Sequence, residues 1–233
     1  MKVELKFSKQ QKLKSYFEPL LIEATSSKFN PKLEVNLYHG KLVLDADVAN
    51  FSFGALHEVF QIAFRKLNLK NLEVGVSPTS PLQALILGFG GGSVASILTE
   101  ELKLNCRITG IEIDEKIIDL RKKYFEPEDT SNIELIIGDA FDLSLVKNKK
   151  FDLIVCDVFN DISVPKELET QNYFEQIKNL LNPNGLFVFN KVVENFKKME
   201  KFSSTETIFE NVFKKNKSFK VLGVNKILCG WNS

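Results

Sequence analysis

Four glycines gather within five residues, directly after an apolar run. They follow residues 84–87, precede a helical pattern over 94–104, and are Gly88, Gly90, Gly91 and Gly92. A strand, a glycine turn and a helix start together bring backbone N–H groups against a nucleotide-like ligand. The spacing departs from G-x-G-x-x-G and lacks the Gly-Lys-Ser/Thr ending of a phosphate loop. The run therefore favours a nucleotide-type ligand, with an ordinary glycine turn as the alternative.

Acidic residues stand at the ends of three further apolar segments: Glu112, Asp139 and Asp157. Glu112 follows the glycine run at roughly the 20-residue spacing that brings a carboxylate to a ribose diol. Asp139 can instead cap a following helix, and Asp157 can simply stabilise the loop after its strand. Because ligands of open α/β sheets bind at the carboxyl ends of strands, the recurrence of acids there predicts one shared crevice.

The elements that must position these residues alternate between strand and helix. The pattern predicts strands over 82–88, 107–113, 132–137, 151–157 and 185–193, and helices over 94–103, 115–124, 169–181 and 195–213. Such alternation indicates a doubly wound α/β fold, with a mostly parallel sheet covered on both faces. Two short β runs meeting around Asn225-Lys226 predict a C-terminal antiparallel hairpin.

The first 50 residues read as a small β segment, and residues 51–233 as the main domain. Residues 32–46 alternate apolar and polar side chains around His39-Gly40, which predicts a β-hairpin. Residues 19–26 favour another strand, with a short helix over 12–21 as the alternative. Residues 53–67 carry apolar side chains at helical spacing.

Composition excludes several classes of function. The chain has 233 residues, a net charge of +1, 44% hydrophobic residues and 26% charged residues, so no global electrostatic attraction to nucleic acid or an anionic membrane is expected. An apolar run of about 18 residues and a signal-peptide pattern are both missing, so we expect a cytoplasmic protein. Three isolated cysteines and two histidines do not suggest a metal site.

Five successive segments carry a family resemblance: LGFGGGS, GIEIDEKIIDLRKKYF, IELIIGDAFDL, FDLIVCDVFND and LLNPNGLFVFN. Together they resemble the class I, Rossmann-like S-adenosylmethionine-dependent methyltransferases, and within that superfamily the spermidine synthase branch. The resemblance covers residues 50–231. It implies a seven-stranded sheet with an antiparallel C-terminal hairpin, and it makes a homodimer plausible.

The resemblance also implies roles for the polar residues at the strand ends. The cofactor would be S-adenosylmethionine or its decarboxylated form, with the glycine run, Gly91 included, beside its methionine portion. Glu112 would accept hydrogen bonds from the ribose hydroxyls, and Asp139 from the adenine amine, with the Ala140 N–H donating to a ring nitrogen. Asp157 would border the cofactor and help deprotonate the attacking amine. Asp114 is expected to cap the next helix.

The chain departs from the spermidine synthase pattern on the side of the acceptor. Gly91 stands where that branch has an aspartate, which would repel the carboxylate of undecarboxylated S-adenosylmethionine. Asn160 replaces a second acid that anchors the polyamine, although Asp161 is adjacent. Leu56 replaces a tyrosine beside His57. We expect His57, Asn160 and Asp161 to contact the acceptor, and the lost carboxylate disfavours a diamine bound in the usual pose.

Three hypotheses follow for the function. The first is methyl transfer from S-adenosylmethionine to a small acceptor, which Gly91 favours. The second is aminopropyl transfer at a rearranged amine site, which Asp157 and Pro165 favour. The third is a non-catalytic binding protein on a degenerate enzyme fold, which a Phe89 side chain filling the methionine site would favour.

Overall fold

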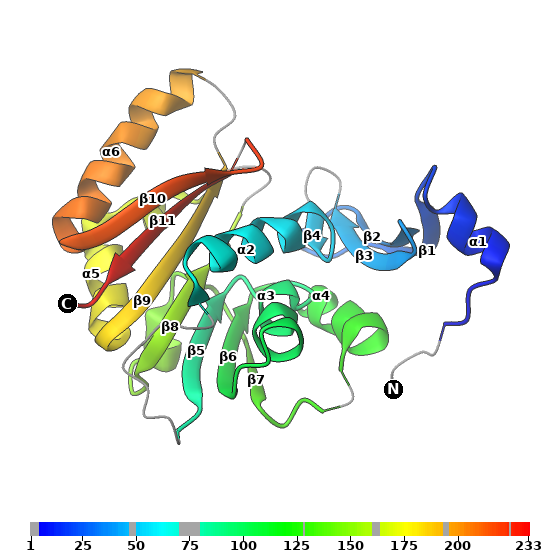
Figure 1. Ribbon diagram of the computed structural model, residues 1–233, viewed down its shortest axis with the longest axis horizontal. Coiled ribbons are helices and arrows are strands. Elements are labelled where there is room, and N and C mark those ends of the chain that lie inside the picture. Colours follow the sequence, from blue (N-terminus) through cyan, green and yellow to red (C-terminus); the bar gives the residue numbers. More distant parts are fainter. Residues whose placement is uncertain are drawn as a thin grey trace.

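The computed structural model describes residues 5–46, 50–69, 80–127, 129–159, 164–192, 196–223 and 225–233. These residues form a seven-stranded sheet, in the order β10-β11-β9-β8-β5-β6-β7, and a four-stranded sheet, in the order β1-β2-β3-β4 (Figure 1). The larger sheet carries helices on both faces, and the smaller one lies beside it at the N-terminal end of the chain. The α/β prediction is therefore confirmed.

The larger sheet is parallel except at its C-terminal edge. Its strands are β5 (Leu82–Leu87), β6 (Cys106–Glu112), β7 (Ile133–Ile137), β8 (Phe151–Cys156), β9 (Leu181–Val192), β10 (Lys215–Val221) and β11 (Asn225–Trp231). The strands β5 to β9 pair in parallel, whereas β11 pairs antiparallel with β9 and β10. The chain runs outward from β5 to β7 and returns to β8 on the other side of β5. Ligands of open α/β sheets bind where the strand order reverses in this way, which here is the carboxyl end of β5.

Different helices cover the two faces of this sheet. The helices are α2 (Ala55–Lys66), α3 (Ser93–Ser96), α4 (Glu115–Leu120), α5 (Gln171–Leu180) and α6 (Phe196–Val212). π-helical turns η2 (Ile97–Glu101) and η3 (Arg121–Phe125) extend α3 and α4, while η4 (Leu143–Val146) and η5 (Lys166–Glu169) are 3₁₀ turns. Apolar side chains of α2 and α3 form the core on one face, and those of α5 and α6 form it on the other.

Two strand boundaries differ from the sequence prediction. Residues 182–185 follow the end of α5, as expected. They lie inside β9, however, because this strand already begins at Leu181. An irregular register between β8 and β9 accommodates these extra residues as a bulge. The predicted antiparallel C-terminal hairpin is confirmed, but the predicted position of its turn, around Asn225-Lys226, is wrong. The chain reverses at Leu222 and Gly223, whose φ angles are 49° and 77°, and Asn225 already pairs with Val221.

The N-terminal residues form α1 (Lys9–Lys14) and the antiparallel strands β1 (Leu20–Thr25), β2 (Leu33–Tyr38), β3 (Lys41–Ala46) and β4 (Asn50–Ser52). The expected hairpin is confirmed, with His39 and Gly40 at φ angles of 50° and 74° between paired neighbours. The strand over 19–26 is confirmed too, whereas the helix alternative over 12–21 is wrong because α1 lies earlier. The division at residue 50 stays a prediction.

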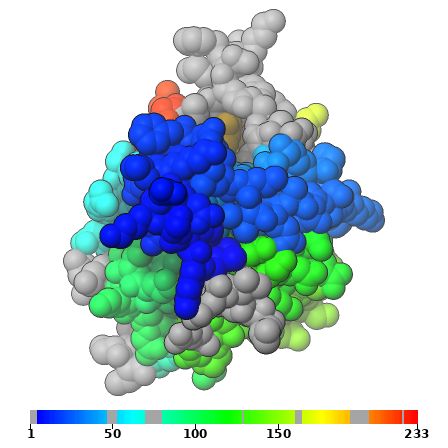
Figure 2. All heavy atoms as spheres, turned by 90° about the vertical axis from the view of Figure 1, so that its right-hand side faces the viewer, coloured from blue at the N-terminus to red at the C-terminus, as the bar shows by residue number. Residues whose placement is uncertain are grey.

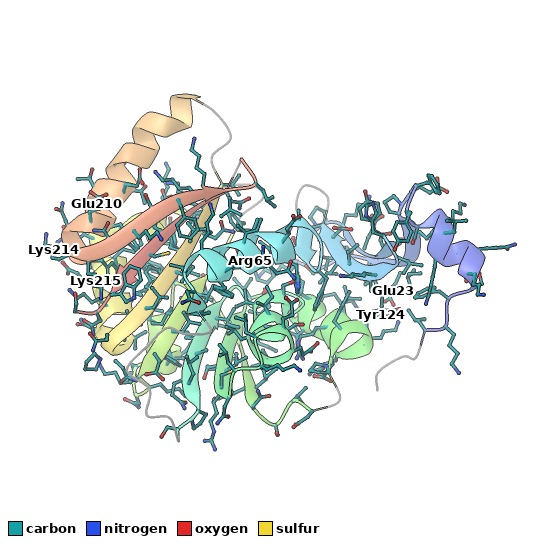
Figure 3. The ribbon with its side chains drawn as sticks, viewed as in Figure 1. Glu23, Arg65, Tyr124, Glu210, Lys214 and Lys215 are labelled. Atoms are coloured by element: carbon teal, nitrogen blue, oxygen red, sulfur yellow. The ribbon has the colours of Figure 1, made fainter. Side chains whose placement is uncertain are left out.

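The small sheet packs on α4 and its π-helical extension. Leu33, Val35 and Leu44 share a core cluster there with Ile117, Leu120 and Tyr124. Glu23 on β1 accepts hydrogen bonds from Lys123 and Tyr124, which lower the pKa of its carboxyl group. Figure 3 labels Glu23 and Tyr124, which lie close together between the two parts of the molecule. Figure 2 shows the N-terminal residues in blue, lying over the green part of the main domain. The segment is thus attached next to the carboxyl end of β6.

Candidate active site

The glycine run forms the loop between β5 and α3. Gly88, Gly90 and Gly92 have φ angles of 78°, 56° and 98°, whereas Gly91 is not among the residues with positive φ. A Cβ on Gly88 would lie 2.3 Å from the Asp157 carbonyl oxygen, so this position also requires glycine for space. The loop therefore needs glycine at Gly88 for two reasons, the positive φ and the space beside Asp157, whereas the backbone conformation of Gly91 does not by itself require glycine.

Glu112 ends β6 beside this loop and is 6% exposed. Its Oε2 accepts a hydrogen bond of 2.8 Å from the Gly90 N–H, and its Oε1 accepts one of 3.0 Å from the Asp114 N–H. Burial raises the pKa of the Glu112 carboxyl group, and the two backbone hydrogen bonds oppose that shift. Glu112 thereby ties the glycine loop to the end of the neighbouring strand.

Asp114 caps α4, as the sequence predicts, and also contacts the N-terminal segment. Its Oδ1 accepts from the Lys116 N–H at 3.0 Å. Its Oδ2 accepts from the Asn30 amide at 2.7 Å and from the Ser27 hydroxyl. Since the Asp114 N–H also holds Glu112, the N-terminal segment supports the position of Glu112 through one residue.

Asp139 follows β7 and is exposed, whereas the adjacent Ala140 is buried. The Asp139 Oδ1 accepts from the Phe141 N–H at 2.9 Å, and Asp142, not Asp139, caps η4. The alternative role of Asp139 as a helix cap is therefore wrong. Its carboxylate stays accessible at the end of the strand.

Three large apolar side chains near these acids are exposed and were missed by the sequence reasoning. Ile113 follows Glu112, Ile137 precedes Gly138-Asp139, and Phe141 follows Ala140. They are 39%, 54% and 49% exposed, respectively. Accessible apolar surface beside hydrogen-bond acceptors suits a flat ring with polar edges. The signal in the sequence was an apolar residue within two positions of a strand-end acid.

Asp157 follows β8 on the other side of the glycine loop and is 9% exposed. Burial raises the pKa of its carboxyl group from 3.8 to about 7; a hydrogen bond from Asn190 opposes the shift, and the charge of Glu112 adds to it. The hydrogen bond runs from the Asn190 amide nitrogen to Asp157 Oδ1 at 2.9 Å. A carboxyl group with this pKa can exchange a proton near neutral pH.

Phe89, the remaining residue within the glycine run, belongs to the core. A Cβ on Gly110 would lie 2.2 Å from the Phe89 ring, so the glycine inside β6 makes room for it. The buried Arg121 guanidinium lies 5.2 Å from the centre of the ring. The Phe89 side chain therefore packs between β6 and η3 and is 3% exposed.

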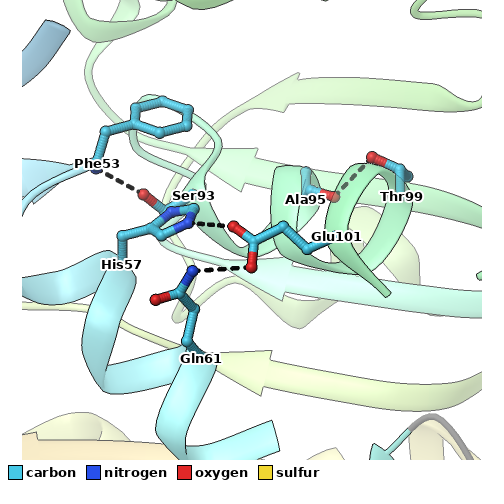
Figure 4. Close-up of polar contacts among 7 residues, drawn as sticks. All are labelled: Phe53, His57, Gln61, Ser93, Ala95, Thr99 and Glu101. Carbon is cyan, nitrogen blue, oxygen red and sulfur yellow. Dashed lines mark hydrogen bonds and ion pairs between the residues drawn. The ribbon is translucent and has the colours of Figure 1, made fainter. Parts of the chain in front are cut away.

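His57 lies on α2, close to the helix that starts after the glycine loop (Figure 4). Its Nε2–H donates to Glu101 Oε1 at 2.6 Å, and Gln61 donates to Glu101 Oε2 at 2.8 Å. Although burial opposes it, these hydrogen bonds lower the pKa of Glu101. Within the described part of the chain, His57 Nδ1 is the buried side-chain nitrogen or oxygen that lacks a partner.

Phe53 covers this histidine. Its ring stacks on the His57 ring with centres 5.5 Å apart, and its backbone φ is 65°. Its N–H donates to the Ser93 hydroxyl at 2.7 Å, which connects it to the residue that follows Gly92. A bulky residue at positive φ is strained, and such strain gathers at functional sites.

The remaining candidates lie elsewhere. Asn160 and Asp161 fall outside the described residues, while Leu56 packs against the core. The fold brings together the glycine loop, Glu112 and Asp157, and it places Asp139 one strand further along, at the same end of the sheet.

Among the described residues, no cluster of three or more His, Cys, Asp or Glu side chains can hold a metal ion. No helix among the same residues has the length and hydropathy needed to cross a membrane.

Comparison with known proteins agrees with this geometry. The chain is 30% identical over 144 residues to a polyamine aminopropyltransferase of Vibrio vulnificus, which covers 60% of this chain and 46% of that protein. Less than half of the length of the first two curated relatives is matched.

Two solved structures share the fold. A spermidine synthase of Thermotoga maritima superposes with a TM-score of 0.64 at 16% identity, over 92% of this chain and 73% of the other. Human methyltransferase-like protein 13, solved in complex with SAH, superposes with the same TM-score at 21% identity, over 74% and 81% of the two chains.

A family model described as "Methyltransferase domain" matches residues 79–228, which is more than half of the chain. The matched range begins just before β5 and ends within β11, so it contains the whole parallel sheet, the glycine loop and the acids at the strand ends. The chain therefore belongs to the methyltransferase domain family.

Proposed function

We propose that this protein is an S-adenosylmethionine-dependent transferase that moves a methyl group to a small acceptor. The observation that carries the proposal is the glycine loop between two buried carboxylates, Glu112 on one side and Asp157 on the other. Glu112 is suited to accept hydrogen bonds from the ribose hydroxyls of the cofactor, and Asp157 is suited to take a proton from the acceptor.

The described residues fit an adenosyl group. Glu112 keeps acceptor capacity for ribose hydroxyls besides its two backbone hydrogen bonds, because each carboxylate oxygen has more than one lone pair. Asp139 would accept from the adenine amine, and the Ala140 N–H would donate to the ring. Ile113, Ile137 and Phe141 supply exposed apolar surface for the flat base. When bound, S-adenosylmethionine supplies the activated methyl group.

Gly91 favours methyl over aminopropyl transfer. The spermidine synthase branch has an aspartate here, which accepts the amine end of the decarboxylated cofactor and repels the carboxylate of the intact one. With Gly91, this repulsion is absent, and the loop accepts the intact cofactor.

On the acceptor side, Asp157 is the base, and its pKa of about 7 suits removal of a proton from an amine or hydroxyl group. We assign His57, Asn160 and Asp161 to acceptor binding. His57 supports this role because, among the described residues, its buried Nδ1 has no hydrogen-bond partner while Glu101 holds Nε2. Nδ1 therefore keeps the capacity to accept a hydrogen bond from the acceptor molecule.

Aminopropyl transfer is the second candidate. The relatives named polyamine aminopropyltransferase favour it, and Asp157 would serve that reaction as well. A non-catalytic role is third, and the packing of Phe89 into the core gives it little support.

Calorimetric titration with S-adenosylmethionine and with its decarboxylated form, side by side, tests these alternatives. We expect tighter binding of the intact form. Tighter binding of the decarboxylated form, followed by product from a diamine, would establish aminopropyl transfer instead. Binding of neither form would reject both transferase assignments.

A further inference from the structure

A row of buried amides leads from the C-terminal hairpin to Asp157. The Asn225 amide nitrogen donates to Asn190 Oδ1 at 3.0 Å, and the Asn190 amide nitrogen donates to Asp157 Oδ1 at 2.9 Å. Asn190 is 0% exposed, Asn225 is 8% exposed and Asp157 is 9% exposed. The three side chains come from segments more than 30 residues apart in the sequence.

The sheet topology brings the three residues together at the carboxyl end of β8 and β9. Because β9 is parallel to β8, Asn190 lies near the end of β9 and next to the end of β8. Because β11 is antiparallel to β9, the first residue of β11, Asn225, lies at that same end of the sheet. Val188 and Ile227 pack in the core on the α2 side, and the alternation of side chains places Asn190 and Asn225 on that face.

The row has a direction. Each amide donates an N–H toward Asp157, and Asn190 also accepts from Asn225 behind it. The row ends on a carboxylate oxygen that can only accept while it is ionised. A hydrogen bond to the ionised form favours that form, against the burial that disfavours it. Apolar residues would fill this part of the core without the cost of burying two amides.

We propose that Asn190 and Asn225 are positioning residues, which hold the Asp157 carboxyl group in one orientation and keep it available as a base. The proposal deepens the function proposed above and rests on it for the role of Asp157 in the reaction. Burial raises the pKa of Asp157 to about 7, and the hydrogen bond from Asn190 opposes that rise, which agrees with this role.

Among the described residues, the other groups around Asp157 do not replace this contact. Glu112, across the glycine loop, acts in the opposite direction because its negative charge raises the pKa of Asp157. On β9, Lys191 next to Asn190 belongs to the other face of the sheet, where it pairs with Glu169 and contacts Thr205 at 3.0 Å. On β8, the adjacent Cys156 is a buried thiol, whose pKa burial raises.

The ionisation of Asp157 can be measured without any ligand. The full-length protein is labelled with ¹³C at the aspartate carboxyl groups and followed by NMR. The signal that disappears in the Asp157→Asn variant is assigned to Asp157. We expect Asn190→Leu to raise the titration midpoint of this signal by about one pH unit, a tenfold change in the ionisation constant. Asn225→Leu, which leaves Asn190 in place, should raise it by less. An unchanged midpoint in either variant overturns the role assigned to that residue.

Asn182→Leu is the matched control. Asn182 on β9 donates to Asp152 Oδ1 on β8 at 2.7 Å, so it makes the same kind of contact between the same strands, at their other end. We expect this variant to leave the Asp157 midpoint unchanged; an equal rise would overturn the proposal by showing a general effect of loosening β8 from β9. If Asn190→Leu does not fold, the comparison of Asn225→Leu with Asn182→Leu decides the matter.

The readout separates the two proposals. A shifted midpoint in a protein that binds no cofactor would support the positioning role and reject the proposed function. In an active enzyme, the acid limb of the pH–rate profile should move to higher pH together with the midpoint in Asn190→Leu. If Asn190→Leu is active and the acid limb of its pH–rate profile does not move, the positioning role is overturned and the proposed function stands.

Discussion

The Glu112 carboxylate accepts a hydrogen bond from the Gly90 N–H at 2.8 Å, so the acid proposed to bind ribose also fixes the shape of the loop proposed to bind the methionine portion. Both functions depend on one buried side chain. This coupling explains why the strand end and the loop must be considered together when either is changed.

Glu112→Gln is expected to weaken S-adenosylmethionine binding by about 10- to 100-fold, the cost of replacing a charge-assisted hydrogen bond with a neutral one. The glutamine keeps an oxygen that can accept from Gly90, so the fold should persist. Calorimetry measures the affinity. Glu134→Gln, an exposed carboxylate on β7 that pairs with Lys149, serves as the control and should bind the cofactor normally. Equal affinities in all three proteins would refute the ribose role.

Asp157→Asn should abolish turnover, and wild-type activity should rise with pH through about 7 as Asp157 ionises. The check is a pH–rate profile of the wild type. Activity that is flat between pH 5 and 8 would argue against Asp157 as the base.

The same carboxyl group predicts how stability depends on pH. Its folded-state pKa lies above the unfolded value near 3.8, so the folded state holds the proton more strongly. The stabilisation from this group is complete below pH 3.8 and is lost as the pH rises through about 7. Asp157→Asn should therefore gain stability relative to the wild type over that range, by a few kcal/mol at most. Urea unfolding at pH 4 and pH 8 tests this; a constant difference would contradict it.

Gly91→Asp should reverse the cofactor preference. The new carboxylate would repel the intact cofactor and attract the amine of the decarboxylated form, and we expect a change of about tenfold or more in the ratio of the two dissociation constants. The fold should tolerate the change, since Gly91 is not among the positive-φ residues. Gly92→Asp is the contrasting variant: at a φ of 98°, with its Cβ 3.3 Å from Arg121 and Phe89, it should lower the melting temperature. An unaltered ratio in Gly91→Asp would remove the basis for preferring methyl transfer.

His57→Gln should raise the KM for the acceptor while the dissociation constant of the cofactor stays the same. The reason is that His57 Nδ1, which is buried and has no partner in the described part of the chain, is the atom assigned to the acceptor. Gln61→Ala, which removes only the second hydrogen bond to Glu101, should have a smaller effect. Steady-state kinetics and calorimetry separate the two quantities; a loss confined to cofactor binding would place His57 at the cofactor instead.

Local sequence signals were sufficient for most of the fold. Alternation, helical periodicity and the glycine run predicted the parallel strands, the hairpin at His39-Gly40 and the cap at Asp114, because each depends on neighbours within a few residues. The C-terminal turn was misplaced since Leu222, a residue that disfavours positive φ, occupies it beside Gly223. The bulge in β9 likewise depends on pairing with a distant strand.

By itself, the sequence determined which residue types stand at the strand ends: the glycines, Glu112, Asp139 and Asp157. Tertiary structure decided what surrounds them. The contact from Asn190 to Asp157, the pairing of His57 with Glu101 and the place of Phe89 beneath its loop join residues from separate elements. No periodicity within one segment encodes such contacts, because they arise only when strand order and helix packing bring distant side chains together.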